Sequence, residues 1–459
     1  MSTTIPDGDF ERALASAPPR PRVFIETYGC QMNERDSRAL LHHLAEQGYE
    51  AADSPQDADV LLLNTCSVRD HAEQKVYSTL GRFREHKLER PHVVIGVGGC
   101  VAQQVGESLF KRAPYLDLVF GTHHLGEVPE LIRKASLERG SRPAALSFER
   151  SWQTALGDHE APDESGVRAF VAVQRGCDRF CTFCIVPFVQ GREITRPSAS
   201  VLDEVRRLAA RGVKEVTLVG QNITSYGRKD PSEPDLAGLL RQIHAVAGIE
   251  RIRFLTSHPA EVGPSLVEAF RDLERLASHV HLPVQSGSDA VLGKMRRGHT
   301  RREYLELAQR LRTARPDLAL TTDLLVGFPG ETDDDYQATL SLVREVEFDN
   351  AFCFSYSPRP NTRALKLEGD LPDEVRAERL ARLLSVQEEV RRARTARWIG
   401  AQVEVLVERA NTRNPGQVEG RSSAYHPVHF SGDIESLRGR MVKVRVERAG
   451  SHSLTGAMA

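Results

Sequence analysis

The chain has 459 residues, more than one ordinary hydrophobic core organises, so two or three domains are expected. Apolar residues make up 40% of the sequence and the formal net charge is −2, which excludes a global basic field and restricts any nucleic-acid surface to a local patch. No apolar run approaches the ~18 residues of a transmembrane helix, and residues 1–20 lack a signal-peptide core and are expected to form a disordered leader.

The segment 21–137 alternates apolar strands with amphipathic helices. Continuous apolar runs that read as strands occur at 22–30, 58–66, 92–100 and 116–124, and a helical pattern covers 34–50. Strands without polar alternation, separated by helices, are typical of a parallel sheet covered on both faces. We therefore predict an N-terminal parallel α/β domain.

Three cysteines of this domain occupy the same structural position. Cys30, Cys66 and Cys100 each follow one of the predicted strands. In open α/β sheets the carboxyl ends of the strands are where ligands bind, so three cysteines far apart in sequence are expected to converge at one edge. A shared site explains this placement better than three separate buried thiols.

Residues 138–166 lack periodicity and are interpreted as a linker. Within the segment 167–398 six strand-like runs then recur with helices between them, which predicts a partial (β/α)6 barrel with its functional residues at the strand carboxyl ends. The runs are 169–174, 215–220, 251–256, 279–284, 318–327 and 350–357. A helix is predicted over 372–398.

The last segment, 399–459, consists of short alternating strands separated by Gly, Asn and Pro turns, which predicts a small antiparallel β-barrel. Small barrels bind RNA through basic faces with aromatic side chains that stack on bases. Tyr425, His426 and Phe430 are candidates for stacking. The candidate RNA-binding residues are Arg438, Arg440, Lys443 and Arg445, and a solvated charged strand is an equal alternative on charge alone.

Cys177, Cys181 and Cys184 follow the first predicted barrel strand with the spacing Cys-x3-Cys-x2-Cys. Closely spaced thiolates select zinc or an iron–sulfur cluster. A structural zinc site ordinarily has four ligands, and neither a fourth cysteine nor a histidine stands at ligand spacing. A four-iron cluster held by three cysteines instead leaves one iron able to bind another ligand.

This motif resembles the signature of the radical S-adenosylmethionine (SAM) enzymes. The resemblance implies that SAM binds the open iron, that Phe183 lies near its adenine, and that reduction cleaves SAM to a 5′-deoxyadenosyl radical. Candidate SAM contacts at the barrel mouth follow or lie within predicted strands: Gln221, Asn222, Gln285, Ser286, Thr322 and Asp323. Helix caps and turns are the alternative role for such residues. Cys353 is interpreted as a structural thiol.

Longer stretches resemble the methylthiotransferases of that superfamily. They are 27–37, 63–76 and 96–100 in the first domain and 281–304 and 321–336 in the barrel, and the final segment resembles the TRAM domain, an OB-like barrel. The resemblance covers roughly residues 22–450. It implies a Rossmann-like first domain, a TIM-like radical SAM barrel, and two [4Fe-4S] clusters. Cys30, Cys66 and Cys100 would hold the auxiliary cluster, and a second SAM would supply the methyl group.

Within this family the sequence "GCQMN" at 29–33 is similar to the branch that acts on isopentenyl-adenosine in tRNA. That branch implies conversion of N6-(dimethylallyl)adenosine at position 37, in the anticodon stem-loop, to its 2-methylthio derivative. The chain departs from the branch at 361–363 and at 187–193. The alternatives are the threonylcarbamoyl-adenosine branch, the branch acting on a ribosomal-protein aspartate, and a non-catalytic iron–sulfur RNA-binding or electron-transfer protein.

The implied partners are the tRNA, a flavodoxin- or ferredoxin-like electron donor, and a sulfur source or iron–sulfur carrier. A cytoplasmic monomer without a membrane partner is expected.

Overall fold

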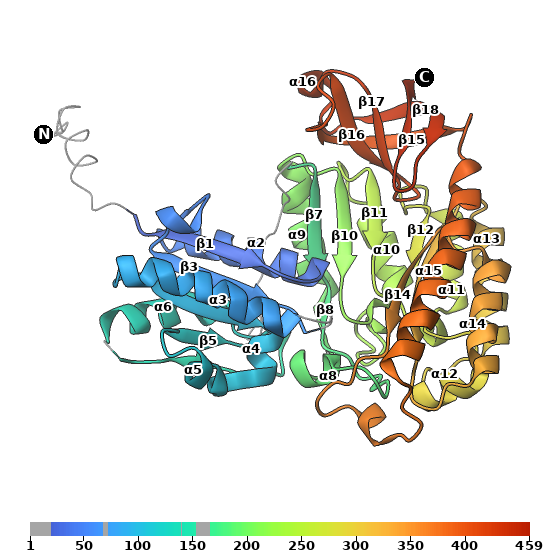
Figure 1. Cartoon of the computed structure of the whole chain (residues 1–459). Coiled ribbons are helices and arrows are strands. Elements are labelled where there is room, and N and C mark those ends of the chain that lie inside the picture. Colours follow the sequence, from blue (N-terminus) through green and yellow to red (C-terminus); the bar gives the residue numbers. More distant parts are fainter. Residues whose placement is uncertain (1–19, 68–71, 139, 153–165) are drawn as a thin grey trace, which may run out of the picture. The chain divides into compact units, whose positions relative to one another are not determined.

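The computed structural model describes residues 20–67, 72–138, 140–152 and 166–459 (Figure 1). They form two compact units. The first contains the chain up to Gly29 and Ala39–Ser147, and the second contains Cys30–Arg38 and Phe148–Ala459. The expected leader lies outside the described residues except for Arg20, and residues 153–165 of the expected linker lie outside them as well.

The first unit is built on a six-stranded parallel sheet in the order β2-β1-β3-β4-β5-β6. Every position of β3 and β4 is buried, as a strand covered on both faces requires. The predicted parallel α/β domain is confirmed. Its strands are β1 (Arg22–Thr27), β2 (Glu50–Ala51), β3 (Val60–Thr65), β4 (Val94–Gly99), β5 (Leu118–Phe120) and β6 (Ala144–Ala145).

The short strand β6 lies inside the segment that sequence alone assigned to the linker. It pairs with β5 through Val119↔Ala144 and Phe120↔Ala145. Two alanines among polar residues give no strand signal, and their pairing with an already formed edge decides their conformation.

The helices of this domain pack their apolar faces against the sheet. Leu61 and Leu63 of β3, for example, share a buried cluster with Val76 and Leu80 of α3. The helices are α2 (Gln31–Glu46), whose residues up to Arg38 belong to the second unit, α3 (Ala72–Glu89), α4 (Cys100–Val105), α5 (Leu109–Arg112) and α6 (Val128–Leu137).

The second unit contains six parallel strands that match the six predicted runs. They form two three-stranded sheets, β11-β10-β7 and β12-β13-β14, and a single parallel bridge, Ile252↔Leu276, lies between them. The strands are β7 (Arg168–Ala172), β10 (Glu215–Val219), β11 (Arg251–Phe254), β12 (His279–His281), β13 (Ala319–Val326) and β14 (Asn350–Ser355). The predicted partial (β/α)6 barrel is confirmed.

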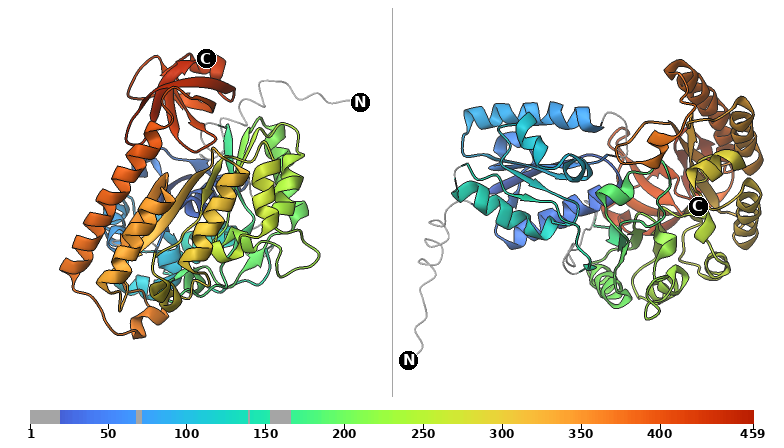
Figure 2. Two further views of the ribbon diagram at one scale, coloured as in Figure 1. Left: turned by 90° about the vertical axis from the view of Figure 1, so that its right-hand side faces the viewer. Right: turned by 90° about the horizontal axis from the view of Figure 1, so that it is seen from below.

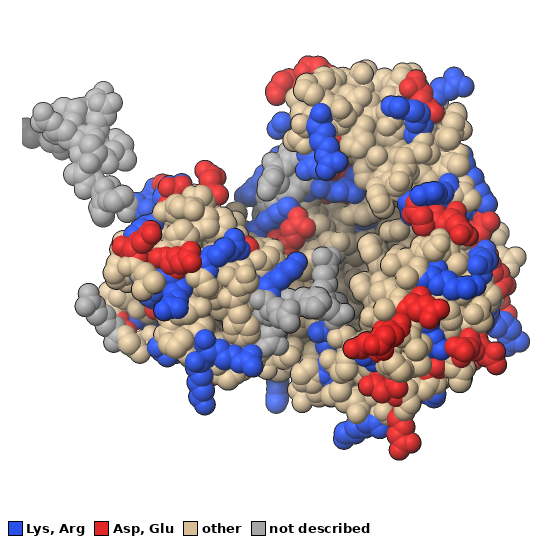
Figure 3. Space-filling model, in the orientation of Figure 1, with Lys and Arg blue, Asp and Glu red and all other residues tan. Residues whose placement is uncertain are grey.

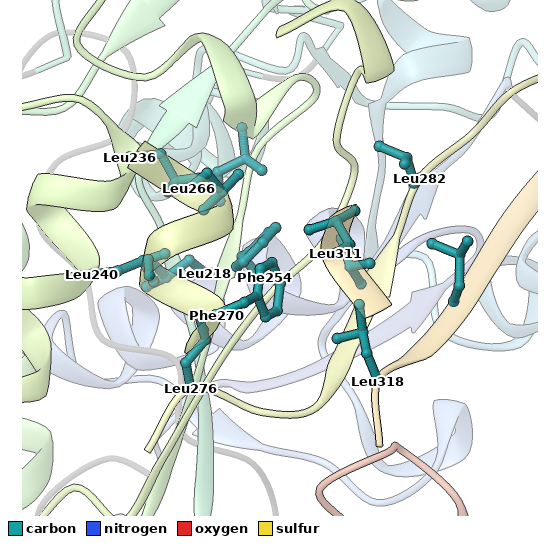
Figure 4. Close-up of a cluster of buried hydrophobic side chains, with 14 of the residues drawn as sticks. Leu218, Leu236, Leu240, Phe254, Leu266, Phe270, Leu276, Leu282, Leu311 and Leu318 are labelled. Atoms are coloured by element: carbon teal, nitrogen blue, oxygen red, sulfur yellow. The ribbon is translucent and has the colours of Figure 1, made fainter. Parts of the chain in front are cut away.

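Helices cover the outside of this barrel, and the largest buried cluster lies between them and the strands (Figure 4). Phe254 of β11 packs on Phe270 of α11 with ring centroids 5.7 Å apart. The helices are α9 (Ser198–Ala210), α10 (Leu236–His244), α11 (Pro264–Asp272), α12 (Asp289–Met295), α13 (Arg301–Ala314), α14 (Asp333–Val346) and α15 (Asp373–Ala396).

The long helix α15 packs against β14 and α14 and leads into the C-terminal barrel (Figure 2). This closed barrel has the strand order β15-β16-β17-β19-β18. Its strands are β15 (Gln402–Ala410), β16 (Gln417–Ser422), β17 (Pro427–Ser431), β18 (Met441–Ala449) and β19 (Leu454–Met458), with helix α16 (Ile434–Leu437) between β17 and β18.

The C-terminal barrel departs from the sequence prediction in two details. Its closing strand β19 was not predicted, because the run "LTGAM" is short and interrupted by glycine. β19 also pairs with β17 in parallel, whereas the other pairs of this barrel are antiparallel. None of the described helices is long and apolar enough to cross a membrane.

Candidate functional site

The loop with Cys177, Cys181 and Cys184 lies beyond the carboxyl end of β7. It connects two short antiparallel strands of two residues each, β8 (Gln174–Arg175) and β9 (Ile194–Thr195). Gly176 has φ +77°, and a Cβ at this position would lie 2.1 Å from the Arg192 carbonyl oxygen. The Cys177 amide donates to the Gly191 carbonyl at 3.2 Å. A glycine is therefore required for the close approach that starts the loop.

Residues from three other elements hold this loop in place. The Gly176 amide donates to Gln221 Oε1 at 2.7 Å, at the end of β10. Thr182 donates through its amide to the Met295 carbonyl and through its hydroxyl to the Lys294 carbonyl, both at the end of α12. The Thr182 carbonyl in turn accepts from the Ala364 amide at 2.9 Å. These hydrogen bonds join the loop to three other parts of the barrel.

The three thiols lie in a protected environment. Cys177 and Cys181 are each 8% exposed. Burial raises the pKa of Cys177 to about 11, and burial together with the neighbouring Cys181 raises that of Cys184 to about 12. Without a metal, Cys177 and Cys184 therefore carry neutral thiols, and binding of a soft metal has to displace their protons.

Arg297 places a cation against this loop. Its Nη1 lies 3.4 Å from Cys181 Sγ, and its Nη2 donates to the Pro283 carbonyl at 2.6 Å. The side chain is buried, so its charge acts in a low-dielectric environment. A guanidinium that donates to sulfur favours the thiolate that a cluster requires.

Among the described residues, no three His, Cys, Asp or Glu side chains lie close enough to hold one metal ion. A four-iron cluster makes a different demand, because each cysteine binds a separate iron. Two buried cysteines and one half-buried cysteine on one hydrogen-bonded loop, with a cationic donor at one sulfur, fit that demand.

Polar groups of neighbouring strands surround the loop. Asn222 Nδ2 donates to Glu261 Oε2 at 2.6 Å, and Arg179 pairs with the other oxygen of Glu261 at 3.4 Å. His258, just after β11, is buried, and neither ring nitrogen has a hydrogen-bond partner among the described residues. Burial and the neighbouring Arg297 and Arg179 hold the pKa of His258 far below its usual range, so this ring is neutral.

The six predicted SAM contacts fall into two groups. Gln221, Asn222 and Asp323 carry polar atoms toward the loop or the barrel interior, and Asp323 Oδ1 lies 3.4 Å from His281 Nε2. Gln285 takes φ +78° and exchanges backbone hydrogen bonds with Asp323 and Leu325.

The remaining two, Ser286 and Thr322, are fully buried. Thr322 Oγ1 donates to the Leu282 carbonyl at 2.9 Å, and Ser286 Oγ accepts from the Ser288 amide at 3.2 Å. These hydroxyls stabilise turns and strand pairing within the fold, which is the alternative role that the sequence left open. Phe183, the predicted adenine neighbour, packs edge-to-face on Phe328 with centroids 6.5 Å apart.

Cys66 and Cys100 lie at the carboxyl ends of the adjacent strands β3 and β4. Thr65 Oγ1 accepts from the Val101 amide at 3.1 Å and donates to the Gly98 carbonyl at 2.5 Å, so one hydroxyl joins the two strand ends. Cys30 follows β1, the other neighbour of β3, and is exposed in the segment that belongs to the second unit. The meeting of all three thiols stays a prediction.

The segment after Cys30 carries a buried ion pair that the sequence did not reveal. Asp36 Oδ2 accepts from Arg175 Nη2 at 2.6 Å, and Arg175 Nη1 donates to Gln190 Oε1 at 2.9 Å. The Arg175 side chain is completely buried. Arg175 stands two residues before Cys177, so this pair joins the chain following Cys30 to the strand that leads into the Cys177 loop.

The basic candidates of the C-terminal barrel are placed as predicted. Arg438, Arg440, Lys443 and Arg445 are exposed, and Val444 and Val446 point into the barrel core. Figure 3 shows acidic and basic side chains interspersed over the visible face, in agreement with the small net charge. The RNA-binding surface stays a local prediction.

The prediction that Phe430 stacks on a base is wrong, and the other two aromatic candidates make contacts within the chain. Phe430 is 1% exposed in the barrel core, and the ring of His426 packs on Trp398. Tyr425 stacks on His279 at 5.0 Å and lies between the guanidinium groups of Arg253 and Arg421, each 4.8 Å from its centroid. The chain uses these rings for packing and for joining the two barrels.

A buried charge cluster makes that junction at the amino end of the (β/α)6 barrel. Glu215, the first residue of β10, pairs with Arg253 Nε at 3.0 Å and with Arg251 Nη1 at 3.3 Å. The two arginines also donate to carbonyl oxygens of the C-terminal barrel, at Arg421 and Glu404 for Arg251 and at Ser423 and Ser422 for Arg253. The only sequence signal was the presence of charges within "RIRF".

Family models match three consecutive parts of the chain. Residues 22–121 match the uncharacterized protein family UPF0004, residues 171–343 the radical SAM superfamily, and residues 396–459 the TRAM domain. The fold is similar to that of the radical SAM methyltransferase TsrM from Kitasatospora setae, with a TM-score of 0.54 at 14% identity, covering 85% of this chain and 79% of that one. The cobalamin-dependent SAM radical enzyme OxsB gives a TM-score of 0.53 at 14% identity, covering 81% and 56%.

Relatives of known name match nearly the whole chain. The tRNA-2-methylthio-N(6)-dimethylallyladenosine synthase of Geobacter metallireducens is 48% identical over 437 residues, covering 95% of this chain and 98% of the relative. The enzyme of the same name from Methylococcus capsulatus is 46% identical over 446 residues, covering 95% of each. The chain belongs to the family of tRNA-2-methylthio-N(6)-dimethylallyladenosine synthases, within the radical SAM superfamily.

Proposed function

We propose that this chain places a methylthio group on adenine C2 of N6-(dimethylallyl)adenosine at position 37 of tRNA. The observation that carries the proposal is the preformed Cys177 loop at the carboxyl end of a radical SAM barrel, in a chain that also places Cys66 and Cys100 at neighbouring strand ends of another unit. The adenine C2–H bond resists acid–base chemistry, so replacing its hydrogen requires one-electron chemistry, which a reduced cluster and SAM supply when bound.

The residues that would hold the first cluster are Cys177, Cys181 and Cys184. Gln221 keeps the entry of their loop in place through the Gly176 amide. Arg297 stabilises the thiolate at Cys181 and, as a buried hydrogen-bond donor to sulfur, favours the reduced state of the group bound there. Asn222 and Gln285 would orient SAM, with Phe183 near its adenine.

Cys30, Cys66 and Cys100 would hold the auxiliary cluster, where the sulfur for the substrate is bound, and a second SAM would donate the methyl group. Thr65 fixes the relation between the strand ends that carry Cys66 and Cys100. Asp36 and Arg175 hold the segment that begins at Cys30 against the start of the Cys177 loop.

Arg438, Arg440, Lys443 and Arg445 would contact tRNA phosphates. Contacts of this kind position the RNA and weaken with salt. The implied setting is a cytoplasmic monomer that receives electrons from a flavodoxin- or ferredoxin-like protein and sulfur from a donor or iron–sulfur carrier.

Iron content and SAM cleavage test the division between the two cysteine sets. The reconstituted protein is expected to bind about eight irons, and Cys177→Ala or Cys66→Ala to retain about four. Cys177→Ala should abolish release of 5′-deoxyadenosine on reduction, whereas Cys66→Ala should keep that release and lose sulfur insertion. Cys353→Ala is the matched control, because this half-buried thiol packs on the outside of β14.

Nucleoside analysis of tRNA tests the substrate. Cells without the protein should lose the 2-methylthio group and keep the dimethylallyl group. Loss of methylthiolated threonylcarbamoyl-adenosine, or of a methylthiolated ribosomal protein, would instead assign the chain to another branch of the family.

Intact SAM cleavage in Cys177→Ala would overturn the radical assignment.

A further inference from the structure

The inner face of β14 carries two unusually exposed aromatic side chains. Phe352 is 51% exposed and Phe354 is 44% exposed. Their neighbours Ala351 and Cys353 point the other way and pack in the core beneath the outer helices. Because strand side chains alternate between faces, both phenylalanines lie on the face of the sheet β12-β13-β14 that lines the barrel interior.

Polar side chains of the adjacent strands share this face. In the strand register Phe352 lies beside Asp323, and Phe354 lies beside Leu325. The ring of His281 meets Phe352 edge-to-face at 5.9 Å. His281 also contacts Thr321 Oγ1 through Nδ1 at 3.0 Å and Asp323 through Nε2 at 3.4 Å.

We infer that Phe352 and Phe354 form the binding subsite for the prenylated adenine of the substrate tRNA, with Asp323 accepting the hydrogen of its N6 amine. This inference rests on the proposed function. The dimethylallyl group is a small branched hydrocarbon and adenine offers a π face, and two open phenylalanine rings match both. Substitution at N6 leaves one N–H, which the partly exposed Asp323 carboxylate is suited to accept.

The position of this aromatic pair favours the substrate over SAM as its occupant. Asp323, beside Phe352, lies in the middle of β13, whereas the Cys177 loop is held by Gln221 beyond the end of β10. A base stacked on the pair would thus lie deeper in the barrel than the loop. An aromatic ring that stays exposed inside a barrel lacks the hydrophobic stabilisation that packing among aliphatic side chains would give. Binding of a substrate base to the two rings would recover that stabilisation.

The test measures selectivity between two RNAs on one reconstituted protein preparation. Anticodon stem-loops with dimethylallyladenosine and with plain adenosine at position 37 compete for binding, and wild type is expected to prefer the first by about tenfold or more. Phe352→Ala and Phe354→Ala should bring this ratio close to one. Because the ratio compares two ligands on the same molecules, a partly inactive preparation does not distort it.

Leu384→Ala is the control, since this leucine is 48% exposed on α15, outside the barrel. SAM affinity and 5′-deoxyadenosine release without RNA should stay within twofold of wild type in both phenylalanine variants. An unchanged RNA ratio would overturn the subsite while leaving the proposed function intact. Loss of SAM binding with an unchanged ratio would assign the rings to SAM. Failure of wild type to modify the prenylated stem-loop would overturn the proposed function itself.

Discussion

Replacement of Glu215 by alanine is expected to destabilise the second unit strongly. Glu215 is completely buried, and its two oxygens pair with Arg253 and Arg251 at 3.0 and 3.3 Å. Arg251 and Arg253 are also almost fully buried. The substitution would therefore leave two cations in the interior without the carboxylate between them.

The structure sets the size of this effect. Removing one member of a buried ion pair costs about 3–5 kcal/mol, mostly because the remaining charge is uncompensated. At about 2 °C per kcal/mol for a large domain, the midpoint of thermal unfolding should fall by roughly 6–10 °C. The carbonyl oxygens of the C-terminal barrel still accept from both arginines, which keeps the loss from being larger.

The pH dependence has a defined sign. Burial alone would raise the pKa of Glu215, but Arg253, Arg251 and Arg168 outweigh it and hold that pKa below its ordinary value. A lowered folded-state pKa gives stability that is present above the unfolded pKa, about 4.3, and is lost as pH falls through the folded value. The difference in the free energy of unfolding between wild type and Glu215→Gln should thus have its full size at pH 7 and decrease below about pH 4.

Calorimetry of wild type, Glu215→Ala, Glu215→Gln and Asp203→Asn measures these differences. Asp203 and its partner Arg206 are both 61% exposed, and such surface pairs contribute about 0–1 kcal/mol. If the midpoint of thermal unfolding falls no further in Glu215→Ala than in Asp203→Asn, the reasoning is refuted. Such a result would mean that water or a rearranged side chain compensates the positive charges of the two arginines.

Three further predictions concern the loop and the RNA surface. Gly176→Ala, whose Cβ would meet the Arg192 carbonyl, should lose about half of the bound iron, whereas Gly212→Ala, with φ +94° and open space, should keep it. Arg297→Met removes a hydrogen-bond donor to Cys181 Sγ and should lower the reduction potential of the Cys177-loop cluster by about 60 mV in an EPR-monitored titration. An unchanged potential would show that this contact does not tune the cluster. Lys443→Glu with Arg445→Glu should weaken tRNA binding by about tenfold at low salt and reduce the salt slope by about two, while SAM cleavage persists.

Much of the architecture was predictable because its strands are continuous apolar runs. The segments "VLLLNT" and "VIGVGG" are buried at every position on both faces of a parallel sheet, so their composition alone indicates a strand. The cysteine motif was equally informative, because both its spacing and its position after the first barrel strand can be read directly from the sequence. The two short strands β6 and β19 were missed, because their pairing partners decide their conformation.

Long-range contacts were the part that sequence could not predict. The pair of Asp36 and Arg175 joins residues 139 positions apart, and neither residue stands out in its local pattern. The incorrect assignment of Phe430 has a simpler origin. In "PVHF" the alternation with Val428 places Phe430 in the barrel core, so the strand pattern itself excludes Phe430 as a base-stacking ring.

The junction between the two barrels has a consequence for how such chains diversify. Arg251 and Arg253 bind main-chain carbonyl oxygens at Glu404 and at Arg421, Ser422 and Ser423, which every amino acid supplies. Tyr425 is the side chain of the C-terminal barrel that both Arg253 and His279 contact. Glu408 also pairs with Arg168 at 3.3 Å, and Ser423 Oγ accepts from the Ser278 amide at 2.8 Å. The C-terminal barrel is therefore attached by the path of its backbone together with a small set of side chains. The exposed remainder of its sequence is free to drift, and exchange of this domain between relatives should preserve the attachment as long as that path and those side chains are kept.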